Sequence, residues 1–114
     1  MKIDWYYHRK NCQSCARADA FLEAAEATIT EQVDARKTRL GPEEAVALAR
    51  EASHVWATKG KKVLHFDMKK SPPTDAELKS ALIGPSGNLR APTFRRGKQL
   101  FVGMNEEEFG KVLG

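Results

Sequence analysis

Hydrophobic and polar positions alternate in two short segments near the start of the chain, residues 2–7 and residues 28–36. Alternation with a period of two is typical of a β-strand. Between these segments, from Cys15 to Ala25, apolar residues recur every three or four positions, which predicts a helix. The residues expected on one face of each strand are Ile3, Trp5 and Tyr7 in the first and Ile29, Val33 and Ala35 in the second. A strand, a helix and a strand of this length should form a right-handed unit whose strands are parallel.

A long helix is predicted over residues 40–60. Pro42 suits its first position, and Glu43 and Glu44 suit the positive end of the helix dipole. Gly60 provides a stop signal at its end. The apolar side of this helix would consist of Ala45, Leu48, Ala49, Ala52, Val55 and Trp56.

The second half of the chain is predicted to hold two further helices and a hairpin. Residues 62–68 have the composition of a strand without clean alternation, so a short strand and a packed loop both remain open. Thr74 and Glu77 form a capping box at the start of a short helix. Residues 91–103 predict two short antiparallel strands around a turn, and a helix capped by Asn105 follows them.

The order of these elements predicts an α/β fold with a mixed sheet. The chain of 114 residues, with 41% hydrophobic and 30% charged residues, has the size and balance of one domain, residues 1–114. Its net charge of +4 comes from lysines and arginines dispersed among acids, without the basic and aromatic stripe of a nucleic-acid surface. No segment approaches the ~18 apolar residues of a membrane helix, and the N-terminus lacks the apolar core of a signal peptide. We therefore expect a mature cytoplasmic protein that contacts neither nucleic acid directly nor a membrane.

The candidate chemistry lies in two cysteines, Cys12 and Cys15, placed where the first strand turns into the first helix. The thiolate is the reactive form of cysteine, and the first turn of a helix favours negative charge. Cys12 would be exposed and activated there. Cys15 would lie one turn further on, against the apolar face and close enough to close a disulfide. The nearby side chains that could add a positive field are His8, Lys10 and Arg17.

Two further interpretations of the cysteine pair remain open. A zinc site can also begin with two cysteines at this spacing, but it needs two more ligands, and the histidines His8, His54 and His65 fit no common structural pattern. In the second interpretation, both cysteines are buried and inert. Redox chemistry is the favoured interpretation, because a pair of this spacing between a strand and a helix is typical of redox motifs. We therefore expect no metal and no cofactor.

A proline stands at the entry of a predicted strand, in the sequence "RAPTF". Proline is disfavoured in a central strand because it cannot donate a hydrogen bond to its neighbour. At a strand start, Pro92 is either a cis proline or a trans proline at the sheet edge, and residue chemistry leaves both open.

Taken together, these segments resemble the arsenate reductase/Spx branch of the thioredoxin-like proteins, and over the same pieces the chain is similar to glutaredoxins. The resemblance covers nearly the whole chain and is carried by "NCQSCARADAFLE", "RKTRLGPEEA", "TKGKKV", "SPPTDAEL" and "RAPTFRRGKQLFVGMNEEEF". It implies a thioredoxin-like fold, a mixed four-stranded sheet flanked by helices. It also implies that Cys12 is the nucleophile and Cys15 the resolving cysteine. Pro92 would be a cis proline packed against the cysteine pair where a substrate backbone docks, with Ala91 and Arg90 beside it.

The chain departs from this family at the positions that hold an oxyanion. The family has an arginine where this chain has Lys59 and another directly before the cis proline, where this chain has Ala91. The Spx-type regulators usually also have an arginine after the second cysteine, where this chain has Ala16. Neither lysine nor alanine reproduces the bidentate geometry of arginine.

The resulting hypothesis is a small thiol–disulfide oxidoreductase whose partners are protein or low-molecular-weight thiols and disulfides. A second hypothesis is an Spx-like redox-sensing regulator that binds RNA polymerase. A third hypothesis is an arsenate reductase, and a fourth is a scaffold in which the cysteine pair only stabilises the fold.

Overall fold

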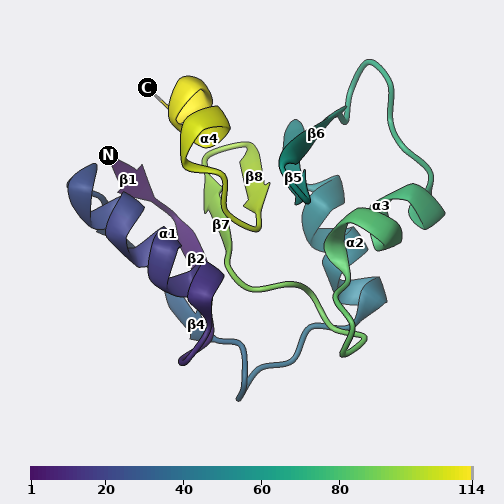
Figure 1. The fold of residues 1–114 in the computed structure, drawn as a ribbon. Coiled ribbons are helices and arrows are strands. Elements are labelled where there is room, and N and C mark those ends of the chain that lie inside the picture. The colour runs from purple at the N-terminus through teal and green to yellow at the C-terminus, as the bar shows by residue number, and fades with distance from the viewer. Residues whose placement is uncertain (114) are drawn as a thin grey trace.

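A computed structural model describes residues 1–113 of the chain as alternating strands and helices (Figure 1). The strands are β1 (Lys2–Ile3), β2 (Trp5–His8), β3 (Thr28–Ile29), β4 (Gln32–Asp34), β5 (His54–Lys59), β6 (Lys62–Asp67), β7 (Thr93–Arg96) and β8 (Gln99–Val102). The helices are α1 (Gln13–Ala24), α2 (Pro42–Arg50), α3 (Asp75–Leu82) and α4 (Glu106–Leu113). The order confirms an α/β fold.

The strands β4, β2, β7, β8, β5 and β6 form the main sheet in that spatial order, and β1 pairs with β3 beside it. The pairs β2–β4 and β5–β8 are parallel, whereas β2–β7, β7–β8 and β5–β6 are antiparallel. The sheet is therefore mixed, as the order of elements predicts. The prediction of four strands is wrong, because the part of the chain that the structure describes places six in this sheet.

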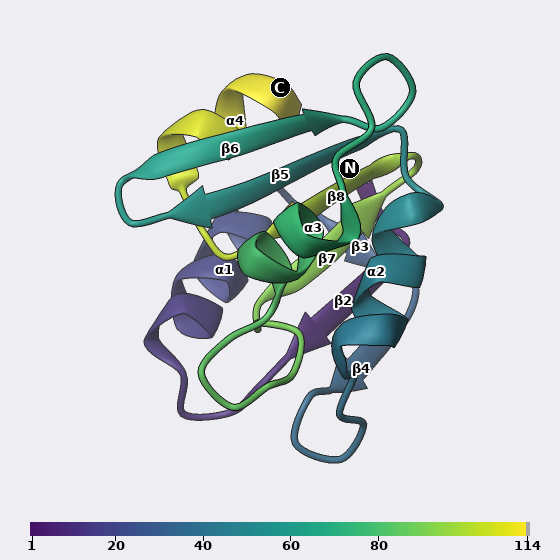
Figure 2. The ribbon, with the colours of Figure 1, turned by 90° about the vertical axis from the view of Figure 1, so that its right-hand side faces the viewer.

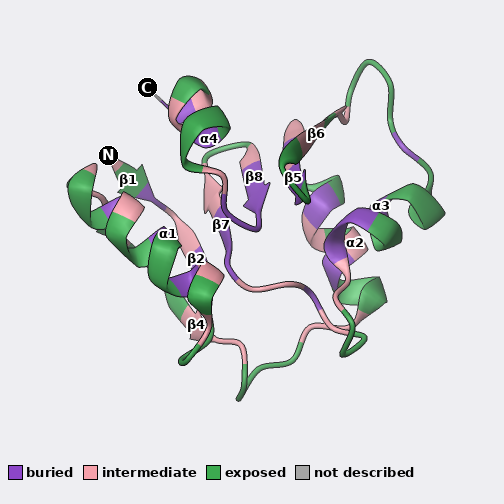
Figure 3. Ribbon diagram, viewed as in Figure 1, coloured by how far each residue is buried: buried purple, intermediate pink, exposed green. Residues whose placement is uncertain are grey.

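Helices cover both faces of the main sheet. Figure 2 shows α2 and α3 in front of the sheet, with α1 and α4 behind it. On the first side, alanines and leucines of α2 and α3 pack against Tyr7, Val55 and Val102. On the other side, apolar residues of α1 and α4 pack against Tyr6 and Phe94. The helices present their buried residues to the sheet and their exposed residues outward (Figure 3).

The first strand is interrupted at Asp4, and this changes which face its side chains occupy. Ile3 packs with the core under α1 and α4, while Trp5 and Tyr7 pack with the core under α2 and α3. The expectation that these three share one face is therefore wrong. Asp4 donates its backbone N–H to the carbonyl of Arg95, which also pairs with Trp5, as in a β-bulge. An extra residue of this kind shifts the alternation by one position.

The parallel partner strand has the same change of face. β3 and β4 keep a constant register with β1 and β2, and they are interrupted at the same level. Ile29 packs under α1 and α4, whereas Val33 and Ala35 pack under α2 and α3. The expected common face of these three residues is likewise wrong.

The predicted long helix over residues 40–60 is wrong in its second half. α2 begins at Pro42 as expected but ends at Arg50, and the following residues form β5. Val55 and Ala57 point into the core while Trp56 packs on the opposite side, which is the alternation of a strand. Gly60 is not a helix stop. It occupies the turn between β5 and β6 with a positive φ of 61°, a conformation that glycine adopts without strain.

The remaining predicted elements are confirmed. The segment left open, residues 62–68, contains strand β6. Thr74 and Glu77 form the capping box of α3, β7 and β8 form the hairpin, and the Asn105 side chain accepts the Glu108 N–H at the start of α4. Among residues 1–113, no helix has both the length and the apolar character needed to cross a membrane.

Candidate functional site

The cysteine pair lies at the start of α1, directly after the end of β2. The chain turns at Asn11, whose φ of 59° is one that asparagine tolerates better than most residues. Cys12 is the N-cap of α1, and its Sγ accepts the backbone N–H of Cys15 at 3.4 Å. Cys12 is half-buried, Cys15 is buried, and both thiols are free. Cys12 is therefore the more accessible of the two sulfurs, although it is half-buried and not fully exposed as expected.

The surroundings of Cys12 favour its thiolate. Partial burial alone would raise its pKa, but hydrogen bonds from the Cys15 thiol and backbone amide and the guanidinium of Arg9 outweigh it. The net effect lowers the pKa of Cys12. Burial, together with the neighbouring Cys12 sulfur, raises the pKa of Cys15. The two thiols are thus asymmetric: the pKa of the half-buried Cys12 is lowered and that of the buried Cys15 is raised.

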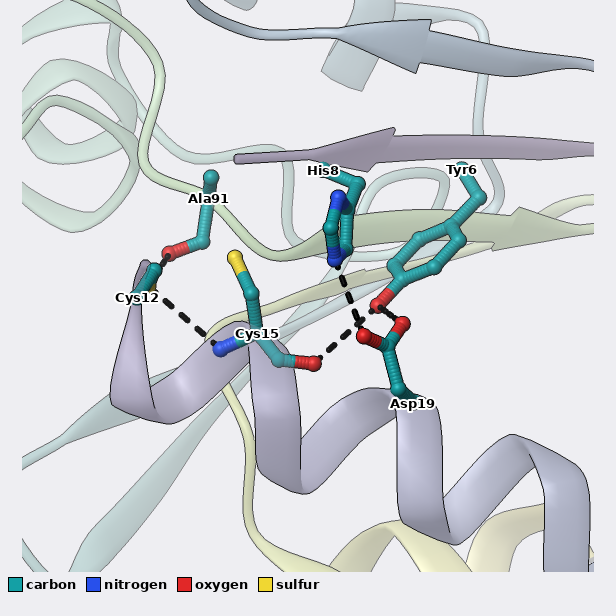
Figure 4. A network of polar contacts seen from close by, with 6 residues as sticks. All are labelled: Tyr6, His8, Cys12, Cys15, Asp19 and Ala91. Atoms are coloured by element: carbon teal, nitrogen blue, oxygen red, sulfur yellow. Dashed lines mark hydrogen bonds and ion pairs between the residues drawn. The ribbon is translucent and has the colours of Figure 1, made fainter. Parts of the chain in front are cut away.

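The segment before β7 lies opposite Cys12. The peptide bond between Ala91 and Pro92 is cis, in agreement with the expectation from the family resemblance. The Cys12 thiol donates to the Ala91 carbonyl across an S···O distance of 3.8 Å (Figure 4). Pro92 is buried, and its carbonyl accepts the N–H of Gly103 at 2.8 Å. Residues far apart in the sequence therefore meet at the outer sulfur.

Arg90 is a structural clamp beside this segment. Its guanidinium is half-buried and donates to the Thr58 carbonyl at 2.7 Å, the Thr58 hydroxyl at 2.8 Å and the Ala81 carbonyl at 3.1 Å. These bonds join the end of β5 to the end of α3. Gly103 leaves room for the clamp, because a Cβ there would lie 2.0 Å from the Thr58 hydroxyl oxygen. The Arg90 guanidinium group therefore makes three hydrogen bonds to Thr58 and Ala81.

His8, Lys10 and Arg17, which the sequence suggested as groups that tune the pKa of Cys12, are not among the groups that shift it. His8 Nε2 lies 3.0 Å from the Asp19 carboxylate, which also accepts the Tyr6 hydroxyl hydrogen bond at 2.8 Å (Figure 4). Burial, followed by this bond to Asp19, raises the pKa of Tyr6. Arg17 donates two hydrogen bonds to Glu106 at the start of α4. Lys10 is exposed in a shallow groove beside Cys12.

Sequence reasoning missed Arg9, the residue whose charge acts on Cys12. Arg9 follows β2 directly and precedes the turn at Asn11. The signal available in the sequence was a cation between a strand end and a helix N-cap. That signal was shared with His8 and Lys10 on either side.

Two of the three histidines weighed as metal ligands, His54 and His65, lie together on the hairpin of β5 and β6. His54 Nδ1 is 2.9 Å from His65 Nε2, and the His65 ring stacks on Trp56 with centroids 3.8 Å apart. His8 lies on β2 with Asp19 instead. Within residues 1–113, no three potential metal ligands come together.

Cys12 and Ala91 line a cleft of about 650 Å³ between the start of α1 and the loops that follow β4 and α3. No protein-family model matches the sequence, and a search among curated proteins gives no match. The chemistry of the site is therefore inferred from its geometry.

Proposed function

We propose that the protein is a small thiol–disulfide oxidoreductase in which Cys12 is the nucleophile and Cys15 the resolving cysteine. The observation that carries the proposal is the N-cap position of Cys12, whose sulfur accepts the Cys15 N–H and lies beside Arg9. Both contacts stabilise the anion, which is the species that attacks a disulfide. Cys15 is buried, its raised pKa favours the protonated thiol, and it lies one helical turn after Cys12.

The reaction proceeds by two exchanges. The Cys12 thiolate attacks one sulfur of a substrate disulfide, R–S–S–R, which forms a Cys12–S–R bond and releases R–S⁻. The Cys15 thiol then loses its proton to solvent, and its sulfur attacks the Cys12 sulfur and releases the second R–S⁻. The protein becomes a Cys12–Cys15 disulfide, and its two lost electrons remain on the released thiolates. An external thiol reductant restores the protein by the reverse exchange.

We also propose that the core of the fold is thioredoxin-like. A parallel β2–α1–β4 unit is joined through β2 to the antiparallel β7–β8 hairpin, and α4 follows the hairpin. This order of strands, β4-β2-β7-β8, supports the resemblance. The β5–β6 hairpin then extends the thioredoxin-like arrangement beyond β8. In such an arrangement the Ala91–Pro92 segment is the place where a substrate backbone would dock.

Arsenate reduction has less support. Lys59, which stands at the position of a family arginine, is exposed and does not line the cleft that holds Cys12. Arg90 lines this cleft, but three of its hydrogen bonds go to Thr58 and Ala81. An oxyanion would have to compete with these bonds.

The proposal is tested by trapping the mixed disulfide. Cys15→Ser removes the resolving sulfur at nearly constant volume, so reaction with a disulfide-containing peptide should give a stable adduct on Cys12, seen as a mass increase. The matched variant Cys12→Ser should give no adduct, and the wild type should release both halves of the peptide. An equal yield of adduct on both variants would contradict the assigned roles.

A second measurement separates catalysis from a purely structural role. Structural disulfides have reduction potentials below about −300 mV. The reduction potential of the Cys12–Cys15 pair should therefore lie above this value. A lower value would indicate that the pair only stabilises the fold.

A further inference from the structure

The cleft beside Cys12 has a strongly one-signed lining. It includes five arginines, and no aspartate or glutamate is among its lining residues within 1–113. These arginines are Arg9, Arg17, Arg36, Arg39 and Arg90. Because the whole chain carries only +4, this concentration of positive charge is a property of the cleft and not of the surface in general.

Two of the five arginines are free to meet a ligand. Arg17 is paired with Glu106, and Arg90 is bonded to backbone and hydroxyl oxygens. Arg9 lines the cleft together with Cys12, and its charge helps to lower the pKa of Cys12. Arg36 and Arg39 are exposed, and in residues 1–113 neither has a carboxylate at ion-pair distance.

The loop that carries Arg36 and Arg39 is fixed against the cleft by the buried Tyr7. The Tyr7 hydroxyl donates to the Thr38 carbonyl at 2.7 Å and accepts the Leu40 N–H at 3.2 Å. The carbonyl of Leu40 accepts the N–H of Leu89, a residue that lines the cleft, at 2.7 Å. The two guanidinium groups are therefore attached to an ordered backbone, which lowers the entropic cost of using them for binding.

The Asp34 carboxylate accepts a backbone hydrogen bond at the start of this loop but does not neutralise the arginine charges. Its Oδ1 accepts the backbone N–H of Arg36 at 2.8 Å, and the Asp34 carbonyl accepts the N–H groups of Lys37 and Thr38. This carboxylate makes no ion pair with Arg36 or Arg39. Their charges remain available on the cleft side.

We propose that the compounds that exchange at Cys12 are small anionic thiols and disulfides, whose carboxylate groups are bound by Arg36 and Arg39. This inference rests on the proposed exchange function and names its substrate class. Guanidinium groups bind carboxylates through two parallel hydrogen bonds, which fixes orientation as well as position. A cleft of about 650 Å³ falls in the range of small-molecule sites. Arg36 and Arg39 would hold the carboxylates while Cys12 attacks the sulfur.

The electron balance of the exchange is unchanged by this selection. The anionic disulfide accepts the two electrons of the cysteine pair and leaves as two anionic thiols. The positive cleft increases the local concentration of such substrates, and this effect weakens as salt shortens the screening length.

The test compares two reagents that act on the same sulfur. Dithiobis(nitrobenzoate) carries a carboxylate on each half, whereas dithiodipyridine is uncharged at neutral pH. We expect the double variant Arg36→Gln/Arg39→Gln to react with the anionic reagent roughly tenfold more slowly at low salt. The rate of this variant with the neutral reagent should change less than about twofold, because Arg36 and Arg39 take no part in the attack of the Cys12 sulfur on the disulfide. High salt should remove most of the difference.

The control removes two charges far from the cleft. Lys69 and Lys98 follow β6 and β7, at the end of the sheet opposite Pro92 and Cys12. Lys69→Gln/Lys98→Gln should leave both rates nearly unchanged, and equal urea midpoints would show that both double variants are folded.

The outcomes separate this inference from the function on which it rests. Equal slowing with both reagents in Arg36→Gln/Arg39→Gln, or equal effects of the two double variants, would overturn the anionic specificity alone. A wild-type protein that reacts with both reagents no faster than free cysteine would overturn the exchange function and this inference with it.

Discussion

Removal of the Arg90 clamp should destabilise the protein strongly, although this residue lies beside the site and not at the Cys12 sulfur. Arg90→Met keeps much of the side-chain volume but removes three hydrogen bonds to Thr58 and Ala81. At about 1 kcal/mol net for each bond, the free energy of unfolding should fall by about 3 kcal/mol. With a urea m-value of about 2 kcal/mol/M, the unfolding midpoint should fall by about 1.5 M.

The assay is urea unfolding followed by tryptophan fluorescence and far-UV circular dichroism. Arg50→Met is the matched control, because Arg50 makes an exposed ion pair with Asp75 on the protein surface. Exposed pairs contribute little, so this midpoint should move much less. Equal shifts for Arg90→Met and Arg50→Met would refute the clamp. Arg90→Lys should restore only part of the loss, since a single ammonium group cannot reproduce the fork of the guanidinium.

Three further changes test local features of the structure. Gly103→Ala should cost at least about 1 kcal/mol more than Gly87→Ala, because both glycines have a positive φ but only at Gly103 would the new Cβ meet the Thr58 side chain, at 2.0 Å; equal midpoints in urea would contradict the close approach. Burial and a neighbouring histidine lower the pKa of His65 below its ordinary 6.5. As the pH falls, His65 is therefore protonated in the unfolded chain before it is protonated in the folded protein, and the free energy of unfolding should decrease below about pH 6.5. A His65→Gln variant whose stability depends on pH as that of the wild type does would rule this out. Thr74→Ala removes the cap of α3 and should cost about 1 kcal/mol in thermal or urea unfolding, whereas an unchanged midpoint would show that the cap is not used.

Elements specified by local interactions could be predicted from the sequence. The capping box of Thr74, the Asn105 cap and the Pro42 start of α2 each depend on residues within one helical turn. The residues after Arg50 could not be assigned in this way, because the same apolar spacing fits a helix or a strand. Their conformation is set by pairing of β5 with β8, across some 45 residues of sequence.

The site was predictable to the extent that it depends on near neighbours. The asymmetry of Cys12 and Cys15 follows from their spacing at a helix start. The position of the Ala91–Pro92 segment near the cysteine pair was expected only from the family resemblance, and the contact of Cys12 with the Ala91 carbonyl was not predicted. The cationic wall formed by Arg36 and Arg39 was not anticipated, because a tertiary contact of Tyr7 brings their loop to the cleft.

The pH dependence of Cys12 alkylation tests the central claim most directly. Iodoacetamide modification of the reduced protein, with each cysteine quantified by mass spectrometry, gives the pKa of Cys12 in place. We expect this pKa to lie below the value of about 8.5 for free cysteine, with Cys15 protected. Arg9→Gln should raise the pKa of Cys12, whereas Lys10→Gln should leave it nearly unchanged. A Cys12 pKa at or above that of free cysteine would contradict an activated sulfur at the start of α1.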